Sequence, residues 1–339
     1  MLQRSMNERG NAIDRCRRIV AISIAVAAMG AGASSMAQTF PSKPIKLVVP
    51  FAAGTGSDLL ARQFIPRFSE LLGQPVVIDN RAGGGGLVAA EFVAGSPPDG
   101  YTLFLGTIAQ FVIAPAVHGD KLRFRPDRDF TPVGTLARSP MILVTGTGDK
   151  APRTVTELVQ RMKSGPTDFS STGAGGFGHL VGEMFSHRVG AKSATHIPYK
   201  GSAQSLTDVA AGEILFAMDS PAAAIGLIKA GKLRALAVTG TERMASMVGI
   251  PTLEESGVKD MDLFAWFGLF APSGVPADVL QKLRSDLSVT VKDVAFRQRL
   301  AILELETFEN DAATMESSIK RDIPFWQKFI RDSGTRVNQ

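Results

Sequence analysis

The stretch IKLVVPFAAGTGSDLLAR, residues 45–62, passes from a short apolar run through small residues into an amphipathic segment. The run IKLVV is brief and nearly all apolar, which is typical of a strand buried on both faces. The apolar residues that follow recur near a 3.6-residue period, which predicts one helix over Leu59, Leu60, Phe64, Phe68, Leu71 and Leu72. Pro66 lies inside this segment and should kink the helix or remove one backbone hydrogen bond.

The same alternation of short apolar runs and amphipathic stretches continues along the chain. Further strand candidates are VVI at 76–78, TLFL at 102–105, MILVT at 141–145, DFSS at 168–171, ILFAM at 214–218 and LRALAV at 233–238. This alternation predicts an α/β fold with parallel sheets covered by helices. From Pro276 onward only helices are expected, near 276–290, 293–302 and 311–332.

The first residues have the pattern of an export signal. Arg15, Arg17 and Arg18 precede the apolar run Ile19 to Met29, which is shorter than the roughly 20 residues that cross a bilayer. Small residues follow, so we predict a signal peptide at 1–37, cleavage between Ala37 and Gln38, and a periplasmic location. The crowded arginines disfavour the alternative, a buried N-terminal helix.

Cysteine content and charge exclude several classes of function. Cys16 is the only cysteine and lies inside the predicted signal, which excludes disulfides, thiolate metal sites and cysteine nucleophiles from the mature chain. The signal carries five Lys and Arg and two acidic residues, so the mature formal charge is about +2 and not +5. No dense basic stripe with aromatic residues is present, and nucleic acid is not an expected partner.

Two glycine-containing loops suit an anion. The segment at 49–62 places small residues before a helix N-terminus, where free backbone amides and the helix dipole attract carboxylate or phosphate. The compatible alternative is that Ser57 or Asp58 caps this helix. The segment FSSTGAGGFGHL at 169–180 contains G-x-G-x-x-G, but no acidic residue follows at the spacing of a dinucleotide site. We therefore predict an anion-binding turn from the amides of 173–177 and the hydroxyls of Ser171 and Thr172.

A third cluster lies in HIPYKGSAQSLTDV at 196–209 and FAMDSPAA at 216–223. Residues Tyr199 to Ser202 end a predicted strand and open a helix, at the carboxyl edge of a sheet where ligands bind in open α/β folds. Lys200 is either a ligand contact or an ordinary solvated lysine. Asp219 either orients a backbone amide or accepts a hydrogen bond from a donor on the ligand.

No catalytic pattern appears in the sequence. G-x-S-x-G, H-E-x-x-H and C-x-x-C are all absent. The histidines have no tight metal-ligand spacing and are interpreted as structural: His118, His179, His187 and His196. We therefore predict no catalytic residue, no metal and no cofactor.

Eight separated motifs carry a family resemblance: PSKPIKLVVPFAAG, GQPVVIDNRAGGGG, PPDGYTL, RDFTPVGTLA, IPYKGSAQSLTD, IKAGKLRALAVTG, PTLEESG and WFGLFAPSGVP. Together they make residues 40–337 similar to the Bug family, the periplasmic solute-binding receptors of tripartite tricarboxylate transporters. The resemblance implies a type II periplasmic-binding-protein fold with two α/β lobes joined by two hinge crossings. It also implies carboxylate binding without enzyme activity.

The resemblance also indicates which residues hold the ligand. Those that match are Phe51, Ala53, Gly54, Thr55, Gly56, Ser57, Asp58, Gly106, Thr107, Ser171, Thr172, Gly173, Gly175, Gly176, Phe177, Tyr199, Lys200, Gly201, Ser202 and Asp219. Departures from the family pattern occur at Ala52, Thr55, Ala114 and Gly176. Gly176 replaces a serine and precedes Phe177, which favours a roomier pocket for an aromatic or longer carboxylate. The alternative is that the Phe177 ring turns into the core.

These observations predict one lobe from 39–142 with 242–339 and a second from 143–241. The expected partners are a small organic carboxylate and the permease subunits of a tripartite tricarboxylate transporter, bound by a monomer. Two alternatives stay open, a receptor for a sensor kinase and a periplasmic hydrolase that uses Ser171 or Ser202.

Overall fold

The strand and helix predicted from residues 45–62 are both present. The computed structural model describes residues 40–308, 311–335 and 337, so the predicted signal peptide and its cleavage site lie outside the described residues. β1 (Ile45–Val49) leads into α2 (Gly56–Leu72), and α2 runs through Pro66 as one helix. Phe64 and Phe68 on its buried side stack at 4.5 Å between ring centroids. The 3.6-residue period thus marked the buried face correctly at Leu60, Phe64, Phe68 and Leu72, whereas Leu59 is exposed.

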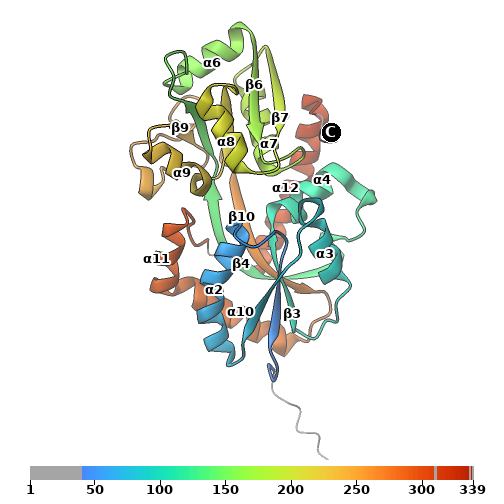
Figure 1. The fold of residues 1–339 in the computed structure, drawn as a ribbon. Coiled ribbons are helices and arrows are strands. Elements are labelled where there is room, and N and C mark those ends of the chain that lie inside the picture. Colours follow the sequence, from blue (N-terminus) through green and yellow to red (C-terminus); the bar gives the residue numbers. More distant parts are fainter. Residues whose placement is uncertain (1–39, 309–310, 336, 338–339) are drawn as a thin grey trace, which may run out of the picture. The chain divides into compact units, whose positions relative to one another are not determined.

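The first sheet is mixed and contains β1. Its strand order is β2-β1-β3-β10-β4, with β2 (Val76–Asn80), β3 (Thr102–Thr107), β10 (Phe264–Pro272) and β4 (Phe130–Pro140). β1 pairs in parallel with β2 and β3, whereas β10 is antiparallel to β3 and β4. The helices that pack against it (Figure 1) are α2, α3 (Leu87–Ala94), α10 (Ala277–Lys292) and α12 (Ala312–Ser333), and α11 (Val294–Ile302) packs on α2 and α10.

The second sheet is also mixed. Its strand order is β7-β6-β8-β5-β9, with β7 (Ser193–Pro198), β6 (Pro166–Ser171), β8 (Phe216–Asp219), β5 (Ile142–Gly146) and β9 (Leu233–Val238). β6 is parallel to β7 and β8, and β5 is antiparallel to β8 and β9. Its helices are α6 (Val155–Ser164), α7 (Phe177–Arg188), α8 (Ser202–Ala211) and α9 (Pro221–Lys229).

Short helical turns complete the described part of the chain. They are η1 (Gly84–Gly86), η2 (Ala109–Ile113), α4 (Ala114–His118), η3 (Gly119–Lys121), α5 (Pro126–Asp129) and η4 (Ala245–Met247). Within the described residues, no helix combines the length and the apolar character that a membrane span requires.

The prediction of parallel sheets is wrong for two strands, β5 and β10, each of which is antiparallel to both of its neighbours. A parallel neighbour requires a crossover connection, usually a helix, between the two strands. β4 instead ends at Pro140 and β5 begins at Ile142, so the chain passes from the first sheet into the second without a helix. β10 returns the chain to the first sheet and is antiparallel to both of its neighbours, β3 and β4. The sequence reasoning missed β4 and β10 as strands, because FTPVGTLARSP contains two prolines and FAWFGLFAP was considered only as a family motif.

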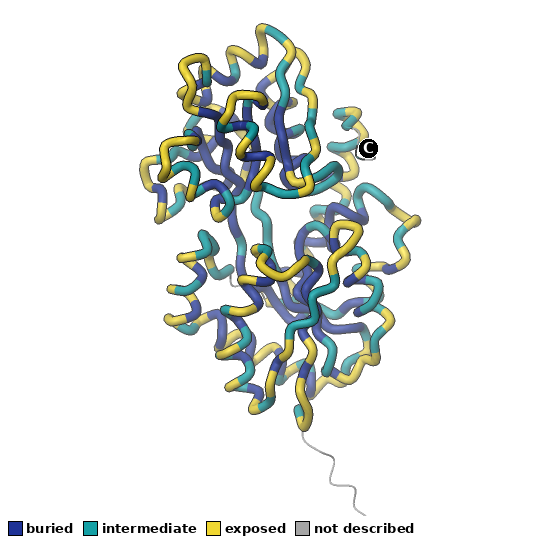
Figure 2. The backbone as a smooth tube through the Cα atoms, in the orientation of Figure 1, coloured by how far each residue is buried: buried dark blue, intermediate teal, exposed yellow. Residues whose placement is uncertain are grey.

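Buried residues fill both sheets and the helix faces that cover them (Figure 2). Phe104, Phe111, Phe130 and Phe270 form an aromatic cluster at the first sheet, with the rings of Phe111 and Phe270 stacked at 3.6 Å. Gly106 is required beside this stack, because an added Cβ would lie 2.3 Å from the Phe111 ring. The end of β3 is therefore held against packed aromatic rings.

Thr239 ties together the two segments that connect the sheets. Its side chain is fully buried, and its Oγ1 accepts a hydrogen bond from Met141 N at 2.8 Å and donates to Leu263 O. Its own N–H donates to Met141 O at 2.8 Å. Met141 lies between β4 and β5, and Leu263 lies just before β10. One hydroxyl thus links both connections.

We predict that Thr239→Val destabilises the protein by about 2–4 kcal/mol, because the isosteric side chain leaves Met141 N and Leu263 O unsatisfied. Thr239→Ser keeps the hydroxyl and loses one methyl group, so its cost should be about 1 kcal/mol. Free energies of unfolding in urea measure both values. A valine variant as stable as wild type would show that this hydroxyl contributes nothing to holding the connections together.

Candidate functional site

The loop between β1 and α2 is braced by a buried carboxylate. Asp58 is 1% exposed, and its Oδ2 accepts hydrogen bonds from Gly54 N and Arg62 Nε, both at 2.9 Å. Asn80 Nδ2 donates to Asp58 Oδ1 at 3.1 Å and to Phe51 O at 3.0 Å. Burial raises the pKa of Asp58, but the hydrogen bonds from Arg62, Gly54 and Asn80 outweigh it and hold the pKa below its usual value. The loop therefore rests on an ionised carboxylate.

The prediction that Ser57 or Asp58 caps α2 is wrong in position. The N-cap is Thr55, whose Oγ1 donates to Ala52 O at 2.8 Å and makes no capping bond to the helix. Both Ser57 and Asp58 lie inside the first turn and are buried. The physical reason is that Asp58 reaches back to Gly54 N, one residue before the cap. Ala53, Gly54 and Gly56 are exposed along this loop.

The end of β3 is joined to the glycine-rich turn at 83–86 by Gln110, a residue that the sequence reasoning missed. Gln110 is fully buried, and its Oε1 accepts from Thr107 N at 3.0 Å and from Thr107 Oγ1 at 2.9 Å. Its Nε2 donates to Gly85 O at 2.7 Å. The signal in the sequence is a single amide inside the apolar run FLGTIAQFVIA. Gln110 thus fixes the Thr107 hydroxyl and the 83–86 turn together.

The second glycine loop connects β6 to α7 and satisfies many of its own polar groups. Ser171 is 1% exposed, and its Oγ lies 2.7 Å from His196 Nε2. Gly175 N donates to His179 Nδ1 at 3.0 Å, and Gly176 N donates to Gly173 O at 3.3 Å. Gly173 and Gly175 have φ angles of 141° and 72°, which L side chains rarely adopt. The Thr172 side chain is exposed.

The third loop, between β7 and α8, lies against the second. Tyr199 N donates to Ser171 O at 3.0 Å, which joins the two loops directly. The Tyr199 hydroxyl donates to Asp208 Oδ2 at 2.6 Å, and this hydrogen bond, with burial and the Asp208 charge, raises the pKa of Tyr199 to about 12. Lys200 is exposed, and Gly201 has extended backbone.

Asp219 lies at the end of β8 with one oxygen satisfied and one unpaired. Its Oδ1 accepts from Ser202 Oγ at 2.8 Å and from Ser220 N at 2.7 Å. Its Oδ2 is buried and has no hydrogen-bond partner among the described residues. Asp219 thus orients the Ser220 amide, the first of the two roles considered from the sequence. Burial raises the pKa of this carboxyl, and its hydrogen bonds only partly offset that effect.

Hydrogen bonds and close contacts bring the predicted residues together in two sets. Ser171 and Tyr199 are joined, as are Ser202 and Asp219, all at the second sheet. Phe51 to Asp58 and Thr107 lie at the first sheet, where the 83–86 turn is close to both: a Cβ on Gly86 would lie 2.8 Å from Pro50 and 2.3 Å from Gln110. Each set lies at the carboxyl ends of parallel strands and at helix N-termini, as expected of a ligand site in an α/β fold.

Phe177 is a predicted site residue whose ring packs in the core. Its side chain is 8% exposed, and its ring meets Trp326 of α12 edge-on at 6.0 Å. It lines a cavity of about 460 Å³ with Ile108, Trp266 and Trp326. This position agrees with the core alternative considered from the sequence.

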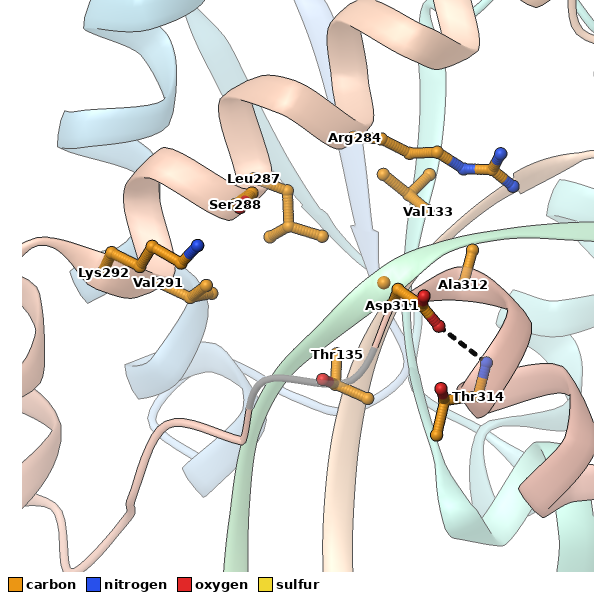
Figure 3. A pocket seen from close by; sticks show the side chains of 11 residues that line it. Val133, Thr135, Arg284, Leu287, Ser288, Val291, Lys292, Asp311, Ala312 and Thr314 are labelled. Atoms are coloured by element: carbon orange, nitrogen blue, oxygen red, sulfur yellow. Dashed lines mark hydrogen bonds between the residues drawn. The ribbon is translucent and has the colours of Figure 1, made fainter.

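A second cavity, of about 380 Å³, lies between β4, α10 and the start of α12 (Figure 3). Val133, Leu287 and Val291 line it with polar groups that include Asp311, which accepts from Thr314 N at 2.8 Å. Its lining contains none of the residues predicted to hold a ligand. Among the described residues, no group of three or more His, Cys, Asp or Glu lies close enough to hold a metal ion.

The family model of the tripartite tricarboxylate transporter family receptor matches residues 60–335. The chain belongs to this family. Among curated relatives, it is 31% identical over 330 residues to a protein from the tcbD–tcbE intergenic region of Pseudomonas sp. strain P51, covering 96% of this chain and 97% of the relative. The resemblance to the Bug family is therefore confirmed.

Solved structures support the same conclusion on fold. The periplasmic binding protein BugD is 31% identical, with a TM-score of 0.75 over 88% of this chain and 99% of BugD. An R. palustris protein solved with adipate is 32% identical, with a TM-score of 0.79 over 87% of this chain and 98% of that protein. MatC from Rhodopseudomonas palustris, solved with malate, is 28% identical, with a TM-score of 0.74 over 86% of this chain and 100% of MatC. The predicted two-lobed periplasmic-binding-protein fold is confirmed.

We predict that Asp219→Asn changes stability in a pH-dependent way. A raised folded-state pKa means that the carboxyl contributes stability when protonated and loses it as pH rises through the folded pKa. The asparagine variant should therefore gain about 1–3 kcal/mol over wild type at pH 8 and lose this advantage toward pH 4. Unfolding in urea across this pH range measures the difference.

The exposed Asp262→Asn variant controls for the removal of one negative charge. A constant difference between Asp219→Asn and wild type at every pH would contradict the prediction.

Proposed function

We propose that this chain binds a small organic carboxylate in the periplasm and delivers it to the membrane subunits of a tripartite tricarboxylate-type transporter. The observation that carries the proposal is membership of the receptor family, together with the relatives solved with adipate and malate. On this proposal the protein acts as a monomer and catalyses no reaction. The export signal at 1–37, cleaved after Ala37, accounts for the location.

The proposed ligand site comprises the two sets of loops at the first and second sheets. Four helices begin at these loops: α2, α7, α8 and α9. Each presents free backbone amides and the positive end of its dipole at its N-terminus. Such ends attract carboxylates without an arginine. The exposed side chains of Thr172 and Lys200 add a hydroxyl and an ammonium group.

We further propose that the lobes comprise 39–142 with 242–339 and 143–241. The connections near Met141 and Thr239 then act as the hinge, and the lobes close over the ligand. The closed form is the one that the membrane subunits recognise.

The ligand class follows from the side chains around the loops. Phe177 is buried against Trp326, so its ring gives little direct support to an aromatic ligand. Two relatives were solved with the aliphatic dicarboxylates adipate and malate. We therefore place aliphatic dicarboxylates, with or without a hydroxyl group, ahead of aromatic acids.

The hydrolase alternative has one feature in its favour, the 2.7 Å contact between Ser171 Oγ and His196 Nε2. However, Ser171 is 1% exposed, which denies a substrate carbonyl access to its oxygen. Burial and the adjacent His179 also lower the pKa of His196 to about 3, far from that of an efficient general base at neutral pH. Ser202 is hydrogen-bonded to Asp219 instead of to a histidine.

We predict that at least one of adipate, malate, citrate and benzoate raises the melting temperature of the ligand-free protein. At 100 times the dissociation constant, binding stabilises the folded state by about 2.7 kcal/mol. Differential scanning fluorimetry measures the shift, with sodium chloride at matched ionic strength as the control. If none of a broad panel of mono-, di- and tricarboxylates shifts the melting temperature, the proposed function is wrong.

Lys200→Ala should weaken carboxylate binding about tenfold, the loss expected when one charge-assisted hydrogen bond is removed. Lys192→Ala is the matched control, because Lys192 is also exposed and lies just before β7 instead of after it. Isothermal titration with the carboxylate that binds wild type gives both affinities. Equal affinities for the two variants would assign Lys200 to the solvated surface.

A further inference from the structure

We infer that His179 and His196 are positioning residues for the second glycine loop, and that they determine which of its backbone amides can bind a carboxylate. This inference rests on the proposed function, because it concerns the same loop. The two residues come from different elements, His179 from α7 and His196 from β7. Their imidazole rings stack at 3.8 Å between centroids with an interplanar angle of 18°.

The stack is enclosed on the side of β6. The Phe169 ring lies 6.2 Å from that of His179 and 5.1 Å from that of His196. His179 is 1% exposed, and the pKa of about 3 leaves His196 uncharged at neutral pH. The two rings therefore pack against each other and against Phe169, and their nitrogen atoms make directed hydrogen bonds to the loop.

The hydrogen bond from Gly175 N fixes the protonation of His179. Because Nδ1 accepts this bond at 3.0 Å, it carries no proton, and the proton of the neutral ring lies on Nε2. His179 Nε2 lies 3.5 Å from Glu183 Oε1, one turn farther along α7. The carboxylate therefore favours the same tautomer that leaves Nδ1 open to the loop.

His196 holds the other end of the loop through Ser171. Ser171 Oγ is 2.7 Å from His196 Nε2, accepts from Gly173 N at 3.4 Å and lies 3.2 Å from Gly173 O. The hydroxyl is therefore used within the protein, and its burial keeps it from a ligand. The sequence-based prediction assigned this hydroxyl to the anion.

These bonds divide the amides of 173–177 into two groups. Gly173 N, Gly175 N and Gly176 N have partners inside the protein. In the described structure, the amides of Ala174 and Phe177 make no such bond, so they are the donors left for a carboxylate. Without the acceptor on His179, Gly175 would lose the bond that fixes its left-handed backbone, and the loop would have to be ordered by the ligand.

Three variants test this role. His179→Leu removes the acceptor, whereas His179→Asn keeps an amide oxygen near the position of Nδ1, and both remove the ring stack. His187→Leu changes an exposed histidine on the same helix and is the control. We expect His179→Leu to weaken binding of the carboxylate found for wild type about tenfold, His179→Asn to restore most of this loss, and His187→Leu to bind like wild type.

A measurement without ligand separates this inference from the proposed function. In wild type, ¹⁵N NMR should show the Nε2–H tautomer of His179 and slow hydrogen exchange at the Gly175 amide. Leucine at 179 should abolish this protection and asparagine should retain it. The opposite tautomer, unchanged protection in His179→Leu, or equal affinities of the leucine and asparagine variants would overturn the positioning role. Failure of every carboxylate to bind wild type would overturn the proposed function. The ligand-free spectra would still test the positioning role of the histidines.

Discussion

The hydroxyl of Thr239 is the interaction on which the arrangement of both sheets depends. The chain leaves the first sheet at Met141 and returns at Leu263, and Thr239 is hydrogen-bonded to both residues. With no helix between β4 and β5, the two sheets share a continuous backbone at this point. The antiparallel placement of β5 and β10 is the geometric result, since neither strand enters its sheet through a helical crossover.

Local sequence was sufficient to predict the elements that form from one run of residues. The runs at 45–49 and 233–238 are strands with those bounds, and the three C-terminal helices lie close to their predicted positions. Apolar content and period report burial directly, which explains this success. β4 was missed because its run contains two prolines and several polar residues, and β10 because it was considered only as a family motif; the two strands pair with each other across more than 120 residues of sequence.

For the candidate site, the sequence was sufficient to predict the loops but not the hydrogen-bond partners of their polar groups. Asp58 was considered as a cap, but it is bonded to Gly54 in the first glycine loop. His179 and His196 were interpreted as structural without their partners, which are Gly175 and Ser171. Gln110 was not considered at all. These roles depend on contacts between separate elements, such as β7 and α7, and not on a local sequence pattern. A hydroxyl or amide that looks available in the sequence can therefore be used internally.

Gln110 has a consequence for the speed of capture. By bonding Thr107 and Gly85 from beneath, it orders the end of β3 and the 83–86 turn before any solute arrives. Fixing one residue of backbone costs about 1–2 kcal/mol in conformational entropy. Because this turn is ordered when the protein folds, that entropy cost reduces the free energy of folding and not that of ligand binding. If this turn belongs to the ligand site as proposed, a solute meets backbone that is already ordered, and loop ordering does not slow association.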